Sequence, residues 1–212
     1  MEELVSTEEC YLHDLTLISD VMRHLESTMS STVNIKTVFG NIGVIRELAG
    51  RLLAQLKHIL LEATDDDLPG LIATAFLDVT TEMKECYSDY CRNYDDAQSL
   101  MEKYEEDERI MSEINSILQS LDHTSGNLVN LQAYLIKPVQ RVLKYPLLFA
   151  ELLKNDPSED EDLKFTHGQL TDVATAINEF KRRKVNDFYM DKKMSRIMLL
   201  CCLNEHASSC ST

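Results

Sequence analysis

The sequence predicts an all-α protein, and three observations support this prediction. The chain has only six glycines and four prolines in 212 residues, too few for the frequent turns of an all-β protein. Along most of the chain, apolar residues recur every three or four positions, which is the period of an amphipathic helix. The length suits one domain. We therefore expect six helices around one core, with no strand.

The first three expected helices are indicated by their apolar faces. The first face ends before the Ser/Thr cluster at residues 27–32. Its members are Leu4, Tyr11, Leu15, Ile18, Met22 and Leu25. The second helix begins after Asn34 and ends at the acidic run 65–67, which a Pro-Gly pair follows. The third runs from residue 71 to about residue 104, and we expect a break near Asn93.

Three further helices are expected in the second half of the chain. A short one covers residues 107–121, and the most apolar stretch follows at residues 128–153. That stretch contains Pro138 and Pro146. Each proline removes a backbone donor and clashes with the preceding turn, so we expect bends there. The last helix follows an acidic loop and runs from about residue 163 to residue 200.

The domain is therefore expected to span residues 1–200, with a short polar tail at residues 201–212 that we expect to be disordered. The cysteines and the histidine of this tail lack the two spaced pairs of a structural zinc site, so no metal is expected. Removal of residues 204–212 is expected to change neither folding nor activity.

The composition narrows the classes of function. The formal net charge of −15 argues against nucleic acid as the main partner, because phosphate binding needs a cationic surface. The six cysteines lack paired CxxC spacing, which favours reduced thiols. No apolar run approaches the roughly 20 residues that cross a bilayer. We expect a cytoplasmic protein that does not bind nucleic acid.

Glu8 is an unusual residue of the first helix. It lies four residues after Leu4 and three before Tyr11, so a carboxylate shares a face with residues that favour burial. The spacing leaves two interpretations open. Glu8 is either a helix-edge glutamate that reaches water or pairs with a cation, or it is a functional carboxylate.

Polar residues of the fifth expected helix are three and four positions apart, on one helical face. They are Lys137, Gln140, Arg141 and Lys144. Residues 134–155 contain four cationic side chains against one acidic side chain, Glu151. A cationic stripe on an acidic protein suits an acidic partner, although a solvated helix face has the same spacing. Residues 181–184 form a second basic block, which indicates either a contact with phosphate or anionic lipid or another solvated face.

Four segments together resemble the Dbl homology (RhoGEF) domain family, in that family's order and spacing. They are LVSTEECYL at residues 4–12, VFGNI at 38–42, YLIKPVQRVLKYPLLF at 134–149 and AINEFKRRK at 176–184. The resemblance covers about residues 1–190, and the third segment is the most specific. The fourth is similar to members in which a BAR domain follows, the Tuba-like group.

The resemblance implies an elongated six-helix bundle that catalyses nucleotide exchange on a protein substrate. Glu8 would engage the first switch of a GTPase, and Lys144 and Asn178 the second. Gln140 and Arg141 would contribute to the same surface, and Lys137, Tyr145 and Tyr11 would support it. Alanine substitution of Glu8 or Lys144 is expected to lower exchange at least tenfold and to leave the domain folded.

The implied partner is a Rho-family small GTPase, either GDP-bound or nucleotide-free. Bound Mg²⁺ holds GDP only while the switch loops keep their shape, so remodelling the switches releases the nucleotide. This is exchange without covalent chemistry, and no cofactor is expected. Peripheral membrane recruitment would depend on missing or adjacent modules. The alternatives are an exchange-impaired GTPase-binding module and a helical scaffold with no GTPase partner.

Overall fold

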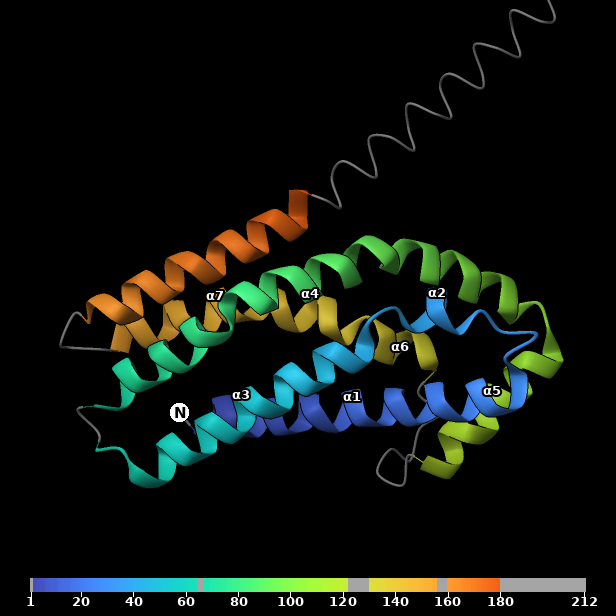
Figure 1. Cartoon of the computed structure of the whole chain (residues 1–212), viewed down its shortest axis with the longest axis horizontal. Coiled ribbons are helices and arrows are strands. Elements are labelled where there is room, and N and C mark those ends of the chain that lie inside the picture. Colours follow the sequence, from blue (N-terminus) through green and yellow to red (C-terminus); the bar gives the residue numbers. More distant parts are fainter. Residues whose placement is uncertain (1, 65–66, 122–129, 156–159, 180–212) are drawn as a thin grey trace, which may run out of the picture. The chain divides into compact units, whose positions relative to one another are not determined.

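A computed structural model describes residues 2–64, 67–121, 130–155 and 160–179, and every regular element in these ranges is a helix (Figure 1). The helices are α1 (Glu2–Met29), α2 (Ile35–Phe39), α3 (Ile42–Glu62), α4 (Leu68–Glu105), α5 (Glu108–Leu121), α6 (Leu131–Leu135) and α7 (Lys137–Asn155). Residues 161–179 are also helical. Within the described ranges, six helices have at least 14 residues, and α2 and α6 are short additions. The predicted all-α bundle is confirmed.

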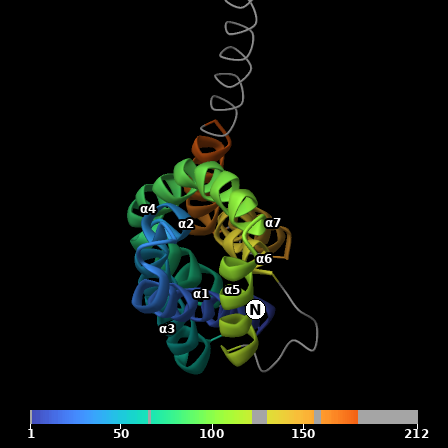
Figure 2. The ribbon, with the colours of Figure 1, turned by 90° about the vertical axis from the view of Figure 1, so that its right-hand side faces the viewer.

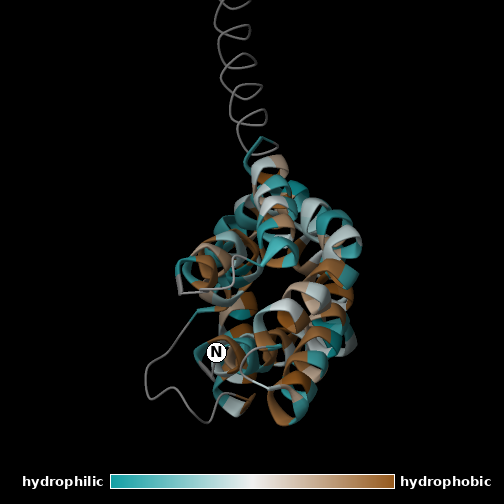
Figure 3. Cartoon of the chain, turned by 90° about the vertical axis from the view of Figure 1, so that its left-hand side faces the viewer, coloured by the Kyte–Doolittle hydropathy of each residue, from teal (hydrophilic) through white to brown (hydrophobic). Residues whose placement is uncertain are grey.

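The chain forms two compact units, residues 1–177 and residues 178–212. In the first unit, α1 and α4 each pack against α2, α3, α5, α6 and α7 (Figure 2). The hydrophobic residues, brown on the ribbon in Figure 3, alternate with hydrophilic ones along each helix, and a continuous set of them is buried between the helices. None of the described helices has the length and apolar character to cross a membrane. The basic block 181–184, the rest of the predicted last helix and the tail lie outside the described residues.

The core is continuous from α1 to the last helix. The apolar face predicted for α1 is buried, and Leu15, Ile18 and Leu25 have no exposed surface. On α4, the Phe76 ring packs edge-to-face against Tyr145 and Phe149 of α7, with centroids 5.2 and 4.8 Å away. Burial of one large apolar side chain such as Phe76 or Phe149 stabilises the folded state by about 1.5–3 kcal/mol. The aromatic contacts therefore join α4 to α7 at the level of the functional site described below.

The second predicted helix is divided into α2 and α3, which the apolar pattern did not indicate. Gly40 has a φ of +53°, a left-handed conformation that ends α2 and that a residue with a Cβ seldom adopts. Two hydrogen bonds with α4 hold the chain in place on either side of this break. Asn93 Nδ2 donates to the Thr37 carbonyl at 2.7 Å, and Asn41 Nδ2 donates to the Cys86 carbonyl at 2.9 Å.

The break predicted near Asn93 is wrong. Helix α4 is continuous for 38 residues, or about 57 Å at 1.5 Å per residue. The Asn93 amide does not compete with its own helix backbone, because it donates to the neighbouring α2 instead.

The two prolines of the predicted fifth helix act differently from each other. A turn at Ile136 separates α6 from α7, and Pro138 then lies in the first turn of α7, where its missing N–H is not needed. Pro146 lies inside α7, and the helix continues through it to Asn155. The buried rings of Tyr145 and Phe149 on either side of Pro146 hold this part of α7 against the core.

The last helix begins at a capping carboxylate. Asp160 Oδ1 accepts the backbone N–H groups of Asp162 at 2.8 Å and Leu163 at 3.1 Å, as an N-cap does. One turn later, the buried hydroxyl of Thr166 donates to the Ala73 carbonyl of α4 at 3.2 Å. These bonds attach the start of the helix to the first half of α4.

Candidate functional site

The centre of the site is the Glu8 carboxylate, which has no exposed surface. It lies on the inward face of α1, between the levels of Leu4 and Tyr11. Arg141 of α7 donates from Nε to Glu8 Oε2 at 2.9 Å, and its Nη2 also reaches this oxygen. The Tyr145 hydroxyl donates to Glu8 Oε1 at 2.9 Å. Both carboxylate oxygens therefore have partners from α7, which compensates for the loss of water.

Arg141 is nearly as enclosed as its partner, with 7% of its surface exposed. Its Nη2 also donates to the Thr7 hydroxyl at 3.2 Å. The guanidinium lies over the Tyr145 ring at 5.1 Å and the Tyr11 ring at 5.8 Å, within the range of a cation–π attraction. Arg141 thus belongs to the buried part of the site and does not lie on an exposed cationic stripe.

The protonation of the pair follows from its surroundings. Burial raises the pKa of Glu8, and the charge and hydrogen bonds of Arg141, together with the Tyr145 hydrogen bond, oppose that rise. Burial of Arg141 alone would lower its pKa, but the charge of Glu8, the nearby Tyr145 and the hydrogen bonds to both together outweigh burial, so the pKa of Arg141 is raised. The guanidinium stays protonated, and the geometry of the donors around Glu8 is that of a buried ion pair.

A hydrogen bond between two tyrosines extends this polar layer to α4. The Tyr11 and Tyr87 hydroxyl oxygens are 2.9 Å apart, and both side chains are buried. Burial raises the pKa of each phenol well above its ordinary value, so both stay neutral. A polar role for Tyr87 was not predicted from the sequence. Tyr87 lies one turn after the core residue Met83, on the same apolar face of α4. Helical spacing therefore predicted an ordinary core residue at this position and not a polar role.

Lys137 supports the same junction from the start of α7. Its Nζ is 2.5 Å from Asp14 Oδ2 of α1 and 4.5 Å from the centre of the Tyr134 ring. Both side chains of the ion pair are partly buried. Helices α1 and α7 are therefore joined by two ion pairs, Glu8–Arg141 and Asp14–Lys137.

The remaining predicted residues of α7 are at the surface. Gln140 and Lys144 are both exposed and four residues apart, so they share one face of the helix. Leu147, one turn after Lys144, is 69% exposed. The predicted polar face is thus two surfaces: Lys137 and Arg141 turn towards α1, whereas Gln140 and Lys144 turn towards solvent.

Asn178 is exposed and helical, but it is the first residue of the second compact unit. The structure therefore gathers Glu8, Tyr11, Lys137, Arg141 and Tyr145 at the junction of α1 and α7. It leaves Gln140 and Lys144 exposed on α7 and does not place Asn178 relative to the others. Among the described residues there is no cluster of three side chains that could hold a metal ion.

The burial of Glu8 changes one sequence-based expectation. We expected Glu8→Ala to leave the fold intact, as for a surface residue. In the structure this change would leave the Arg141 charge buried without its partner, which is strongly destabilising. The loss of exchange expected for Glu8→Ala would therefore be accompanied by a loss of stability.

Comparisons with known proteins agree with the sequence resemblance. The RhoGEF domain family matches residues 1–178. Dynamin-binding protein (Tuba) of Canis lupus familiaris is 35% identical over 193 residues, which cover 87% of this chain and 12% of that protein. Rho guanine nucleotide exchange factor 38 of Mus musculus is 33% identical over 195 residues, covering 87% of this chain and 25% of that protein. The chain thus spans about an eighth and a quarter of the lengths of these two relatives.

Solved structures share the fold. A structure of the Vav1 exchange factor matches with a TM-score of 0.74 and 25% identity, covering 89% of this chain and 52% of that one. The linker-DH/PH structure of p115-RhoGEF has a TM-score of 0.70 at 16% identity, covering 84% of this chain and 55% of that one, a likeness of fold alone. Because the family match extends over most of the chain and the relatives are more than 30% identical, the chain belongs to the RhoGEF (Dbl homology) domain family.

Proposed function

We propose that this chain is a guanine-nucleotide exchange factor that binds a Rho-family GTPase and promotes GDP release. The observation that carries the proposal is the buried Glu8–Arg141–Tyr145 cluster. It holds α7 against α1, and the exposed Gln140 and Lys144 lie within one turn of Arg141, one before it and one after it. A rigid helix face that presents a cation and an amide suits the binding of an acidic loop on another protein.

In this proposal the second switch of the GTPase binds to Lys144 and Gln140, and Asn178 contributes an amide that can both donate and accept. Three residues support this surface without contacting the GTPase. Lys137 of α7 pairs with Asp14 of α1, and the rings of Tyr11 and Tyr145 hold the Arg141 guanidinium in place. The support for this division is the burial of one set of residues and the exposure of the other.

Glu8 requires a rearrangement. Its carboxylate is enclosed in the free domain, so contact with the first switch requires it to exchange Arg141 and Tyr145 for groups of the GTPase. Only a partner that offers donors of similar strength compensates for breaking the buried pair. The release of Glu8 from Arg141 and Tyr145 is thus linked to the binding of the GTPase.

The chemistry occurs on the GTPase. On the GTPase, the switch residues would hold the Mg²⁺ that neutralises the phosphates of GDP, and a change in the shape of the switches would weaken that hold. A domain that binds the nucleotide-free form more tightly than the GDP-bound form shifts the equilibrium towards release. No covalent step and no cofactor of the domain itself enters this scheme. We place the activity in the cytoplasm, with any membrane recruitment supplied by adjacent modules.

The test is the release of fluorescent GDP from a panel of Rho, Rac and related GTPases, with and without the domain. We expect accelerated release from at least one member at catalytic amounts of domain. Binding to the nucleotide-free GTPase without acceleration would instead support an exchange-impaired binding module. Neither binding nor acceleration across the panel would contradict the proposal.

A further inference from the structure

A surface groove runs between the second half of α3 and the first turns of α4. It has a volume of about 490 Å³ and is lined by Ala54, Gln55, His58, Ile59, Leu71, Thr74, Ala75 and Asp78. The two helices follow each other through a short connection, so they are antiparallel neighbours. The small side chains of Ala54 and Ala75 do not fill the space between the helices. Leu71, 42% exposed, forms one wall.

The groove opens at one end into an acidic mouth. This second hollow, of about 700 Å³, shares His58, Ile59, Leu71 and Thr74 with the groove. The acids that line the groove and its mouth are Glu62, Asp67, Asp78, Asp160 and Asp162. Among the described lining residues, only His58 can carry a positive charge, and its Nδ1 is 3.4 Å from Glu62. An apolar wall therefore leads into a strongly negative rim.

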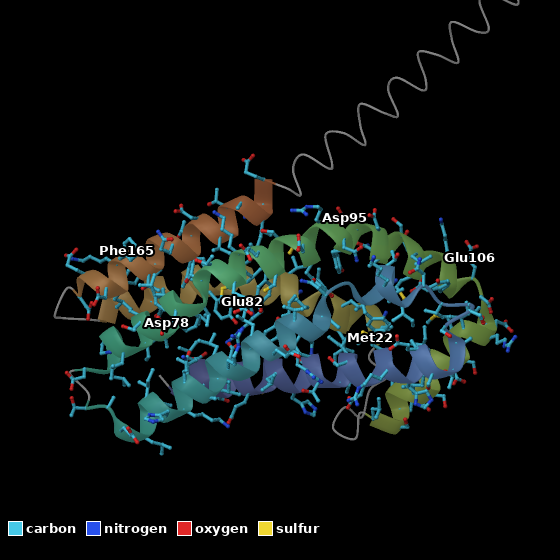
Figure 4. All side chains as sticks on the ribbon, in the orientation of Figure 1. Met22, Asp78, Glu82, Asp95, Glu106 and Phe165 are labelled. Carbon is cyan, nitrogen blue, oxygen red and sulfur yellow. The ribbon has the colours of Figure 1, made fainter. Side chains whose placement is uncertain are left out.

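This groove is separate from the candidate exchange site. The exchange site is built from α1 and α7, whereas the groove is built from α3 and α4. Asp78 lies along α4, followed one turn later by Glu82, which pairs with Arg51 of α3 (Figure 4). A ligand of the groove and a GTPase at Gln140 and Lys144 would contact different residues.

We propose that the groove binds a basic amphipathic helix of a partner protein. Leu71, Ile59 and Ala75 suit the apolar face of such a helix, and the acidic mouth suits the lysine or arginine side chains beside that face. A groove between two antiparallel helices accepts a third helix through the ordinary packing of ridges into grooves. Phosphate groups of nucleic acids or anionic lipids are repelled by the same carboxylates.

The test uses a fluorescein-labelled helical peptide of about 18 residues, with leucines at positions i, i+3, i+4 and i+7 and lysines elsewhere. One control peptide has serines in place of the leucines, and a second has glutamates in place of the lysines. Binding is followed by fluorescence anisotropy. No GTPase is present, so the outcome is independent of the proposed exchange activity.

Three variants of the chain locate the binding. Thr74→Trp fills the groove from the exposed surface of α4, and Asp78→Lys reverses a charge on its wall. Glu102→Lys makes the same change of net charge at an exposed position of α4 outside the groove lining. We expect Thr74→Trp and Asp78→Lys to weaken binding at least about fivefold and Glu102→Lys less than about twofold. Melting temperatures of all three variants check that each is folded.

The proposal predicts that both control peptides bind more weakly than the parent peptide. It is overturned if the serine peptide binds as tightly as the parent, because attraction to the net negative charge would then be sufficient. It is also overturned if Glu102→Lys weakens binding as much as Asp78→Lys does, or if the folded wild-type chain does not bind the parent peptide.

Discussion

Glu8 and Arg141 are 133 residues apart in the sequence, yet each is the main partner of the other. A buried ion pair contributes little net stability compared with apolar residues of the same shape, but breaking one costs about 3–5 kcal/mol. The asymmetry arises because the remaining charge has lost its water without gaining a partner. The loss of either partner should therefore weaken the junction of α1 and α7.

A double-mutant cycle measures this coupling. We expect Glu8→Ala to lower the free energy of unfolding by about 3–5 kcal/mol, because it leaves Arg141 buried and unpaired. Arg141→Met should have a similar effect, and the double variant should lose less than the sum of the two. Urea unfolding of the four proteins provides the values, with the exposed Glu3→Ala as control. Additive losses would mean that the two residues are not coupled.

Lys144 belongs to the exposed set, and its removal should affect the partner and leave the fold unchanged. We expect Lys144→Ala to lower the rate of GDP release at least about tenfold, as for the loss of one member of an interfacial charge pair. Lys154→Ala removes the same charge from another exposed position of α7 and should change the rate less than about twofold. Equal rates for the two variants would remove Lys144 from the interface.

The described cysteines should differ in reactivity. Burial, together with the charge of Glu82, raises the pKa of the Cys86 thiol to about 12, so almost none of it is thiolate at pH 8. Cys91 is also buried, whereas Cys10 is exposed. Iodoacetamide at pH 8 should therefore label Cys10 well before Cys86 or Cys91, as measured by peptide mass spectrometry over time. Early labelling of Cys86 in the folded chain would contradict its burial.

At the scale of the elements, the sequence predicted the long helices well and their interruptions poorly. The apolar period that defines a helix is local, so the extents of α1 and α5 could be read from it. The same period continues from Val38 to Ile42 across the Gly40 break, which hid the division of α2 from α3. The break depends on Asn93, more than 50 residues away, and no local pattern reports that contact.

Gly40 and Gly43 form a matched pair for testing the break. At Gly40, a Cβ would face a positive φ and lie 3.3 Å from Asn93 Nδ2, so we expect Gly40→Ala to lower the free energy of unfolding by about 1–2 kcal/mol. At Gly43, inside α3, no heavy atom other than those of the adjacent residues and the helix's own nearby backbone would lie within 4 Å of the new Cβ. Gly43→Ala should stabilise by up to about 1 kcal/mol, because alanine favours a helix. Thermal unfolding of the two variants would refute the assignment of the break if both were stabilised.

At the scale of the whole molecule, the residues of the candidate site could be named from the sequence, but not their division into buried and exposed sets. The resemblance identified Glu8, Arg141 and Lys144 together. Arg141 turns inward because its partner Glu8 lies on α1, 133 residues earlier in the sequence. Helical spacing within α7 cannot show such a contact. Tyr87 was not predicted for the same reason, since its partner Tyr11 lies on another helix.

The described core is confined to the first compact unit, since its buried apolar residues lie between Leu4 and Ile177. We therefore expect removal of residues 204–212 to change the melting temperature by less than about 2 °C, within the effect of a surface change. The rate of GDP release should also stay the same. Differential scanning calorimetry and the exchange assay on the shortened chain test this expectation, and a large drop in either would show that the tail contributes.

The two ion pairs between α1 and α7 also have a geometric consequence. Asp14 meets Lys137 and Glu8 meets Arg141, so the order of the acids along one helix is the reverse of the order of the cations along the other. Sliding one helix along the other by a single turn, about 5.4 Å, would separate both pairs at once. The two ion pairs thus fix the axial register of α1 and α7. We therefore expect a displacement of α7 along its axis to move α1 with it.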